Sequence, residues 1–151
     1  PERETFAKLL PDGVFAGYLQ GDDLARAYAS ADMFFNPSIT ETFGNVTLEA
    51  MASGLPSVGA AAAGSRSLIE DGVTGFVAEP VMESFAEKVA QLGSNAQMRR
   101  RMGETARARS EEFCWDAVLA ELVSHYHEAV EDFTPFAAAA GNAASARTRA
   151  A

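Results

Sequence analysis

The chain has little of several features that define whole classes of protein. Only one cysteine, Cys114, occurs in 151 residues, so no internal disulfide can form and a reducing compartment is favoured. No long apolar run and no basic-then-apolar leader is present, which argues against a membrane span or secretory signal in this segment. Basic residues are scarce, with 12 Lys and Arg against 21 Asp and Glu. The resulting net charge of -9 argues against a general nucleic-acid binder.

What is present is the composition of a soluble globular protein. Hydrophobic residues make up 48% of the chain, which excludes the disordered and collagen-like classes. A chain of this size buries about 70% of the surface that it exposes when unfolded, which is enough for a core. One domain is therefore the expected count.

Short apolar runs alternate with helical stretches along the chain. The expected strands are 13–19, 32–38, 56–60 and 75–80, and the expected helices are 22–31, 44–53, 81–93, 95–112 and 114–133. This alternation predicts an α/β fold, a Rossmann-like parallel sheet with helices on both faces. The chain opens with a helix and a strand, without the usual Gly-rich first turn, which predicts an incomplete domain. The alanine-rich segment 134–151 is expected to be a disordered tail.

The stretch from residue 37 to residue 56, PSITETFGNVTLEAMASGLP, places two glutamates around a Phe-Gly-Asn corner. A helix that starts at Gly44 or Asn45 leaves about four amides, those of residues 45–48, without intrahelical acceptors, and such an end attracts phosphate. In an open parallel sheet this corner lies beyond the carboxyl end of the preceding strand, where ligands bind. The stretch therefore predicts an anion site.

Glu41 and Glu49 flank this predicted anion site. Glu49 lies roughly 6–7 Å along the helix axis from its start, about the length of a ribose. A carboxylate accepts hydrogen bonds from two vicinal hydroxyls at once, so Glu49 suits a ribose and Glu41 a sugar on the other side. Hydroxyl, phosphate, hydroxyl is the order of groups in a nucleotide sugar. For Glu49 alone, stabilisation of the helix dipole is the simpler interpretation.

The same stretch resembles the signature of the family 4 retaining glycosyltransferases of GT-B fold. It has a Pro-Ser strand end, a glutamate, seven residues, a second glutamate, and then Ala-x-Ala-x-Gly-x-Pro. The flanks VFAGYLQGDDLARAYASADMFFNPS and AAAAGSRSLIEDGVTGFVAEP resemble that family too. The resemblance implies that residues 1–133 are the C-terminal, nucleotide-sugar donor-binding domain of a GT-B enzyme, N-terminally incomplete, whose N-terminal acceptor domain is missing from this sequence.

The resemblance also implies roles for individual residues. Glu41 is implied to be the catalytic residue that contacts sugar hydroxyls, and Glu49 to bind the ribose. The donor sugar and diphosphate are implied to meet the segment after Glu41, namely Phe43, Gly44, Asn45, Val46 and Thr47. The base is expected near Gly17, Tyr18 and Leu19. No cofactor and no metal are expected, because the nucleotide-diphosphate sugar is a substrate.

Two features depart from the family pattern. Thr42 stands where the family has a small or aromatic residue, and Ser57 stands where it has a valine. The family's upstream Arg and Lys, which neutralise the diphosphate, have no counterpart in this sequence. Helix-end amides are therefore the only anion-binding groups that the sequence predicts.

Other candidate residues have simpler interpretations. His125 and His127 are expected to be solvated. A solvated helix is favoured over a membrane or partner face for Arg99, Arg100, Arg101, Arg107 and Arg109, because glutamates lie between them. A core-facing stripe is predicted for Trp115, Val118, Leu119, Leu122, Tyr126, Val130 and Phe133. No histidine accompanies Ser38, Ser53 or Cys114 as a hydrolase triad requires.

The function predicted is that of a retaining, metal-independent hexosyltransferase that moves a sugar from a nucleotide sugar to a lipid, polyprenol or saccharide acceptor. A GT-B sugar-nucleotide epimerase and a non-catalytic nucleotide-binding module are the alternatives. The expected location is cytoplasmic, with room for peripheral contact of the full-length protein with the inner face of a membrane.

Overall fold

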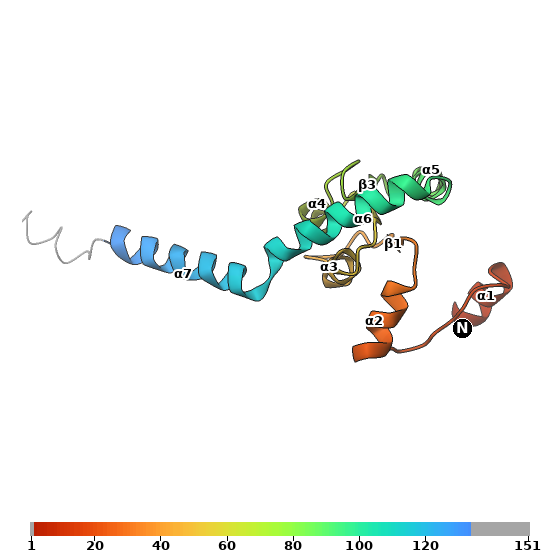
Figure 1. Cartoon of the computed structure of the whole chain (residues 1–151), viewed down its shortest axis with the longest axis horizontal. Coiled ribbons are helices and arrows are strands. Elements are labelled where there is room, and N and C mark those ends of the chain that lie inside the picture. The colour runs from red at the N-terminus through yellow and green to blue at the C-terminus, as the bar shows by residue number, and fades with distance from the viewer. Residues whose placement is uncertain (1, 134–151) are drawn as a thin grey trace, which may run out of the picture. The chain divides into compact units, whose positions relative to one another are not determined.

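The computed structural model describes residues 2–133, so the predicted tail at 134–151 lies outside the described residues. Figure 1 labels the elements in chain order. The described residues form two compact units, divided between Arg109 and Ser110. Within the described part of the chain, no helix is both long enough and apolar enough to cross a membrane.

The first unit contains a three-stranded parallel sheet in the order β1-β2-β3. The strands are β1 (Phe34–Asn36), β2 (Ser57–Ala60) and β3 (Gly75–Ala78). Phe34 pairs with Ser57, and Ser57 with Gly75. The predicted strand at 32–38 ends before Pro37 because proline has no N–H to donate. The predicted parallel α/β fold is thereby confirmed.

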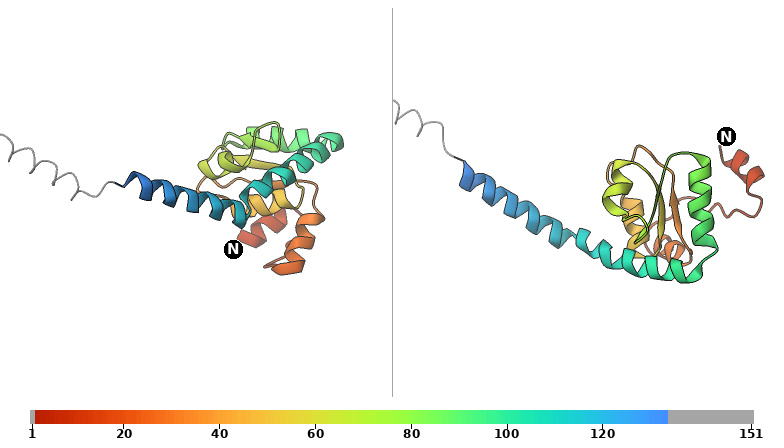
Figure 2. Two further views of the ribbon diagram at one scale, coloured as in Figure 1. Left: turned by 60° about the vertical axis from the view of Figure 1, so that its left-hand side comes forward. Right: turned by 90° about the horizontal axis from the view of Figure 1, so that it is seen from above.

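Helices cover both faces of this sheet. The helices of this unit are α1 (Glu2–Leu9), α2 (Gly21–Ala29), α3 (Asn45–Ala52), α4 (Ala63–Leu68), α5 (Met82–Gly93) and α6 (Ala96–Ser110), and of these α3 and α5 contact the strands directly. In the right-hand view of Figure 2 the strands lie between α4 on one side and α5 on the other. Since α3 and α4 also contact each other, the two crossover helices β1-α3-β2 and β2-α4-β3 share one face.

The core beneath α5 and α6 is made of side chains from the sheet and from these two helices. Its buried members are Val58, Phe76, Ala78, Leu92 and Met102, with Met33, Phe85, Val89 and Met98 packed around them. On the α3 and α4 side, Met51 and Leu68 are fully buried. These apolar contacts hold β1 and β2 in register, which in turn places the loops after both strands.

Three sequence-based assignments in this unit need correction. Residues 13–19 form no strand, and Val14 is 91% exposed. A strand needs a neighbour for its N–H and C=O groups, and none of the described residues pairs with this segment. The opposite error concerns α4, a helix that the alanine-rich stretch 60–68 did not suggest. The strand at 32–38 is also only half-buried rather than buried.

Ser57, the first residue of β2, is a buried polar residue. Its side chain is completely buried, and its hydroxyl has no hydrogen-bond partner within the described chain. A buried hydroxyl without a partner carries its full desolvation cost. The unbonded hydroxyl of Ser57 thus lowers the stability of the fold. In the sequence, this position stands out only because the resembled family has a valine there.

We expect Ser57→Ala to raise the free energy of unfolding by about 1 kcal/mol, because it removes the unsatisfied hydroxyl and leaves little space. Urea unfolding measures the change. Ser94→Ala is the matched control, since the Ser94 hydroxyl is exposed and bonds the carbonyl of Gln91, and its loss should matter little. A lower free energy of unfolding in Ser57→Ala than in wild type would contradict the conclusion that the Ser57 hydroxyl destabilises the fold.

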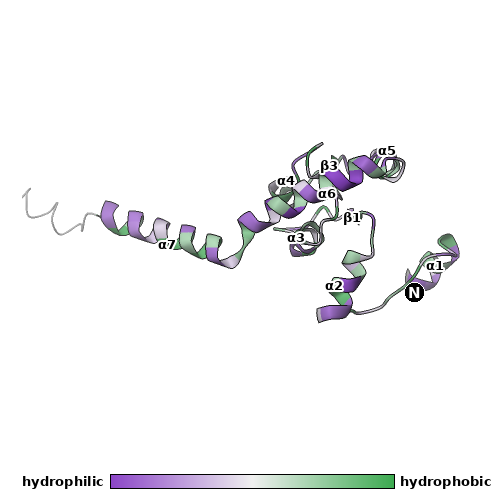
Figure 3. Ribbon diagram, viewed as in Figure 1, coloured by the Kyte–Doolittle hydropathy of each residue, from purple (hydrophilic) through white to green (hydrophobic). Residues whose placement is uncertain are grey.

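The second unit contains a short 3-10 helix, η1 (Glu111–Phe113), and α7 (Trp115–Asp132). Apolar and polar residues alternate along α7 (Figure 3), but no residue of α7 is buried. The prediction that the Trp115 stripe is core is therefore wrong for the described chain. Trp115 itself is 78% exposed. His125 and His127 are exposed, as expected.

Candidate functional site

The first turn of α3 has the free amides that an anion site requires. Gly44 precedes the helix with a φ of 98°, a left-handed conformation that favours glycine, and no side chain caps the helix. The amides of Thr47 and Leu48 both donate to the Gly44 carbonyl, at 2.9 and 3.0 Å. Two of the four amides expected to be free are therefore occupied. Those of Asn45 and Val46 have no acceptor in the described residues.

The loop that carries Glu41 is held between α3 and α4. A Cβ on Gly64 of α4 would lie 2.7 Å from the Glu41 carbonyl oxygen, so only glycine permits this approach. A Cβ on Gly44 would lie 3.4 Å from both Glu41 Cγ and Leu68 Cδ1. Close packing on both sides fixes the backbone of Glu41 and leaves its side chain half-buried.

Asn36, the last residue of β1, orients the Glu41 carboxylate. Its Oδ1 accepts a hydrogen bond from the Ser38 amide at 3.1 Å, which turns its Nδ2 toward Glu41. Nδ2 donates to Glu41 Oε2 at 3.4 Å. The strand end therefore sets both the position and the direction of this carboxylate. No sequence signal points to Asn36, because its partner lies in a loop whose shape cannot be predicted.

Glu49 lies on the exposed side of α3, one turn beyond the free amides, and is bound by a residue of another helix. The Tyr28 hydroxyl of α2 donates to Glu49 Oε2 at 3.1 Å. Burial, followed by the hydrogen bond to Glu49 and the charge of that carboxylate, raises the pKa of Tyr28 to about 12. The phenol is therefore a protonated donor at physiological pH.

A hollow of about 330 Å³ lies between α2 and α3 beside Glu49. Its lining residues are Gly21, Leu24, Ala25, Tyr28, Glu49, Ala52 and Ser53. The segment expected near a base, Gly17 to Leu19, directly precedes this lining, and Tyr18 is 87% exposed. The hollow is apolar apart from Tyr28, Glu49 and Ser53, so it suits a flat ring beside a hydroxyl-bearing group.

The other predicted site residues differ in exposure. Phe43, Asn45 and Val46 are exposed around the start of α3, whereas Gly44 and the side chain of Thr47 are buried. Thr47 can thus support the turn, but its side chain does not reach a ligand. Within residues 2–133, no group of three His, Cys, Asp or Glu side chains could hold a metal ion.

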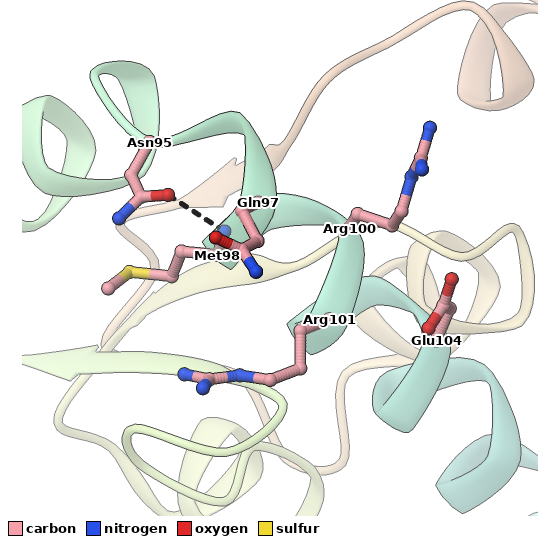
Figure 4. A pocket seen from close by; sticks show the side chains of 6 residues that line it. All are labelled: Asn95, Gln97, Met98, Arg100, Arg101 and Glu104. Carbon is pink, nitrogen blue, oxygen red and sulfur yellow. Dashed lines mark hydrogen bonds between the residues drawn. The ribbon is translucent and has the colours of Figure 1, made fainter.

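A second hollow, of about 460 Å³, lies at the start of α6 (Figure 4). Asn95 caps that helix by accepting a hydrogen bond from the Met98 amide at 2.9 Å. Arg100 and Arg101 point in different directions, so they do not converge on one anion (Figure 4). The first amides of α6 also make no hydrogen bond within the described residues, but Asn95 caps this helix and Glu104 is the one carboxylate in the lining, so the hollow is a weaker candidate than the start of α3.

Two arginines predicted to be solvated are structural. Arg99 donates to the carbonyls of Leu92 and Gly93, both at 2.8 Å, at the end of α5. Arg109 donates to the carbonyl of Leu68 at 2.9 Å, at the end of α4. A guanidinium at a helix C-terminus satisfies carbonyls that lack intrahelical partners. Arg99 and Arg109 therefore tie α6 to α5 and α4, which the sequence pattern did not show.

Comparison with known families identifies the chain by class. Residues 5–109 match the family described as glycosyl transferases group 1, and the chain belongs to this family. Its parallel α/β sheet is that of GT-B glycosyltransferases.

Individual relatives are similar over most of this chain. The sulfoquinovosyl transferase of Arabidopsis thaliana is 39% identical over 135 residues, which are 85% of this chain and 26% of the relative. The GDP-mannose-dependent alpha-mannosyltransferase of Mycolicibacterium smegmatis is 40% identical over 125 residues, 83% of this chain and 33% of the relative. The chain thus spans about a quarter to a third of these proteins.

Solved structures agree with the sequence relatives. Sucrose-phosphate synthase from Thermosynechococcus elongatus superimposes with a TM-score of 0.74 at 26% identity, over 87% of this chain and 35% of its own. HepE of Anabaena, solved in complex with UDP and glucose, gives 0.68 at 28% identity, over 82% of this chain and 36% of its own.

Proposed function

We propose that this chain is the donor-binding part of a family 4 retaining glycosyltransferase that uses a nucleotide-diphosphate sugar. The relatives are named as transferases of sugars, and one neighbour was solved with UDP and glucose. The acceptor site is proposed to lie in a further domain of the full-length protein, because the chain spans only about a quarter to a third of its relatives. The acceptor class is a lipid, a polyprenol or a saccharide.

The observation that carries this proposal is the arrangement at the start of α3. The free amides of Asn45 and Val46 stand in one helix turn, with the carboxylates of Glu41 and Glu49 before and after them. A bare phosphate would be repelled by two carboxylates, whereas a diphosphate with hydroxyl groups at both ends satisfies all four groups. The hollow beside Glu49 gives the base a place next to the ribose.

The proposed mechanism assigns a task to each of these groups. The amides of Asn45 and Val46, with the positive end of the α3 dipole, stabilise the charge that builds on the departing diphosphate. Glu41 holds hydroxyls of the donor sugar and orients its anomeric carbon while the acceptor attacks from the face that the diphosphate leaves. Glu49 holds the ribose, so the diphosphate stays aligned with the helix end.

A panel of nucleotide sugars tests the proposal. Incubation of the full-length protein with UDP-, GDP- and ADP-linked hexoses should release the nucleoside diphosphate from one donor class, slowly by hydrolysis and faster with an acceptor. The sugar in the product should keep its anomeric configuration, which nuclear magnetic resonance reads directly. Release from none of the donors, or an inverted product, would refute the proposal.

We expect the full-length enzyme to keep its transfer rate when all divalent metal is removed. Metal-dependent enzymes present carboxylates to one shared ion, and Glu41 and Glu49 are instead placed for hydroxyls on either side of a diphosphate. Transfer is measured with and without excess EDTA, at constant ionic strength and after the protein has been stripped of metal. Collapse of the rate and its recovery with manganese would show that helix-end amides are not the main stabiliser.

A further inference from the structure

Tyr28 joins α2 to the first turns of α3 at the candidate ribose-binding carboxylate. Its hydroxyl lies 3.1 Å from Glu49 Oε2 and 3.4 Å from the Val46 carbonyl oxygen. Its ring packs edge-on against Phe34 of β1, with ring centroids 6.0 Å apart and an interplanar angle of 61°. The phenol is thus anchored on the sheet at one end and bonded to the site at the other.

We propose that Tyr28 is a positioning residue for Glu49, holding Oε2 so that Oε1 is presented to the ribose hydroxyls of the donor. This inference rests on the proposed function, because it concerns how the same site binds its nucleotide. Nothing in the Glu-x7-Glu pattern points to Tyr28, which lies 21 residues before Glu49.

Glu49 needs such a partner because it is exposed on a helix surface. A glutamate without a partner there samples several rotamers, and a ligand that needs one of them pays the entropy of ordering it. A hydrogen bond from a rigid neighbour restricts the carboxylate before the ligand arrives. Tyr28 is such a neighbour, since Phe34 limits the movement of its ring.

The hydrogen-bond capacity of the carboxylate leaves room for the ligand. A carboxylate has about four acceptor positions, and Tyr28 uses one of them on Oε2. Within the described residues, Oε1 makes no hydrogen bond. The raised pKa of Tyr28 keeps its hydroxyl protonated, so it donates and does not compete with the ribose for hydrogens. The adjoining hollow of about 330 Å³ has Tyr28 and Glu49 in its wall.

The test compares Tyr28→Phe with wild type in the full-length protein. Phenylalanine keeps the ring and its packing on Phe34 and removes only the hydroxyl. We expect KM for the preferred nucleotide sugar, and Kd for its nucleoside diphosphate, to rise about five- to tenfold with kcat unchanged. Tyr126→Phe, on the exposed surface of α7, is the matched control and should equal wild type.

A double-mutant cycle separates positioning from general loosening of the fold. In the Glu49→Ala background, and with a 2′,3′-dideoxynucleoside diphosphate, Tyr28→Phe should change Kd less than twofold, because the carboxylate or its hydroxyl partners are gone. If Tyr28→Phe still raises Kd about five- to tenfold in the Glu49→Ala background, or with the dideoxynucleoside diphosphate, the inference is overturned. If wild type binds a nucleoside diphosphate and Tyr28→Phe binds it equally well, only the role of Tyr28 falls. If wild type binds none, the proposed function falls with it.

Discussion

Replacement of Glu41 by alanine is expected to lower kcat of the full-length enzyme by about 100- to 1,000-fold, the largest effect of any single change in this chain. The carboxylate is held in place before the donor binds, by Asn36 at its oxygen and by the glycine contacts at its backbone. A group that is fixed in this way can strengthen its bonds to sugar hydroxyls as charge develops at the anomeric carbon. Such contacts lower the barrier rather than merely the KM.

Steady-state rates for Glu41→Ala and Glu41→Gln measure this effect. Glutamine keeps the size and one acceptor oxygen, so its kcat should fall between those of wild type and alanine. Glu121→Ala, an exposed glutamate on α7, controls for a general effect of lost charge. A kcat within threefold of wild type in Glu41→Ala would remove Glu41 from the proposed mechanism.

Replacement of Glu49 by alanine should raise KM for the donor about 10- to 100-fold and leave kcat within about threefold of wild type. The ribose lies away from the reacting bond, so its hydrogen bonds are equal in the ground state and the transition state. Losing equal contacts in both states changes binding and not the chemical step. Initial rates over a wide range of donor concentration separate the two constants.

The contrast between the two glutamates is the critical outcome. If Glu49→Ala lowers kcat as strongly as Glu41→Ala does, the ribose assignment is wrong and both carboxylates act on the sugar. If Glu41→Ala changes only KM, the roles are reversed. Asp132→Ala, at the exposed end of α7, is a further control that should leave both constants unchanged.

Much of the fold around the site could be predicted because local signals decide it. Pro37 ends β1, Gly54 follows α3 with a φ of 79°, and the apolar runs at 57–60 and 75–78 are too short for helices. The segment 13–19 was wrongly predicted to be a strand because its apolar residues are typical of strands. Strand formation also depends on a partner elsewhere in the chain, which the local pattern does not show. The short helix α4 was missed because it lies in a run of alanine, glycine and serine.

The residues of the candidate site likewise fall into those that local sequence signals predict and those that only tertiary contacts reveal. Glu41, Gly44 and Glu49 could be selected from their spacing, since a helix start and its first turns follow local rules. Tyr28 could not be selected from the sequence, because only the packing of α2 against α3 brings its hydroxyl to Glu49. Gly64 and Asn36 depend equally on tertiary contacts with Glu41. Residues that are far apart in the sequence and meet only in the folded chain produce no periodic pattern in the sequence.

The most direct test of the central claim is a nuclear magnetic resonance titration of the nitrogen-labelled chain with UDP and GDP. Backbone amide shifts locate even weak binding, which is what helix-end amides alone should provide. We predict that the largest shifts occur at Asn45 and Val46, and that the Asn95 and Gln97 amides at the second hollow stay unchanged. Shifts centred on Asn95 and Gln97, with Asn45 and Val46 unmoved, would contradict the proposal that the start of α3 binds the diphosphate.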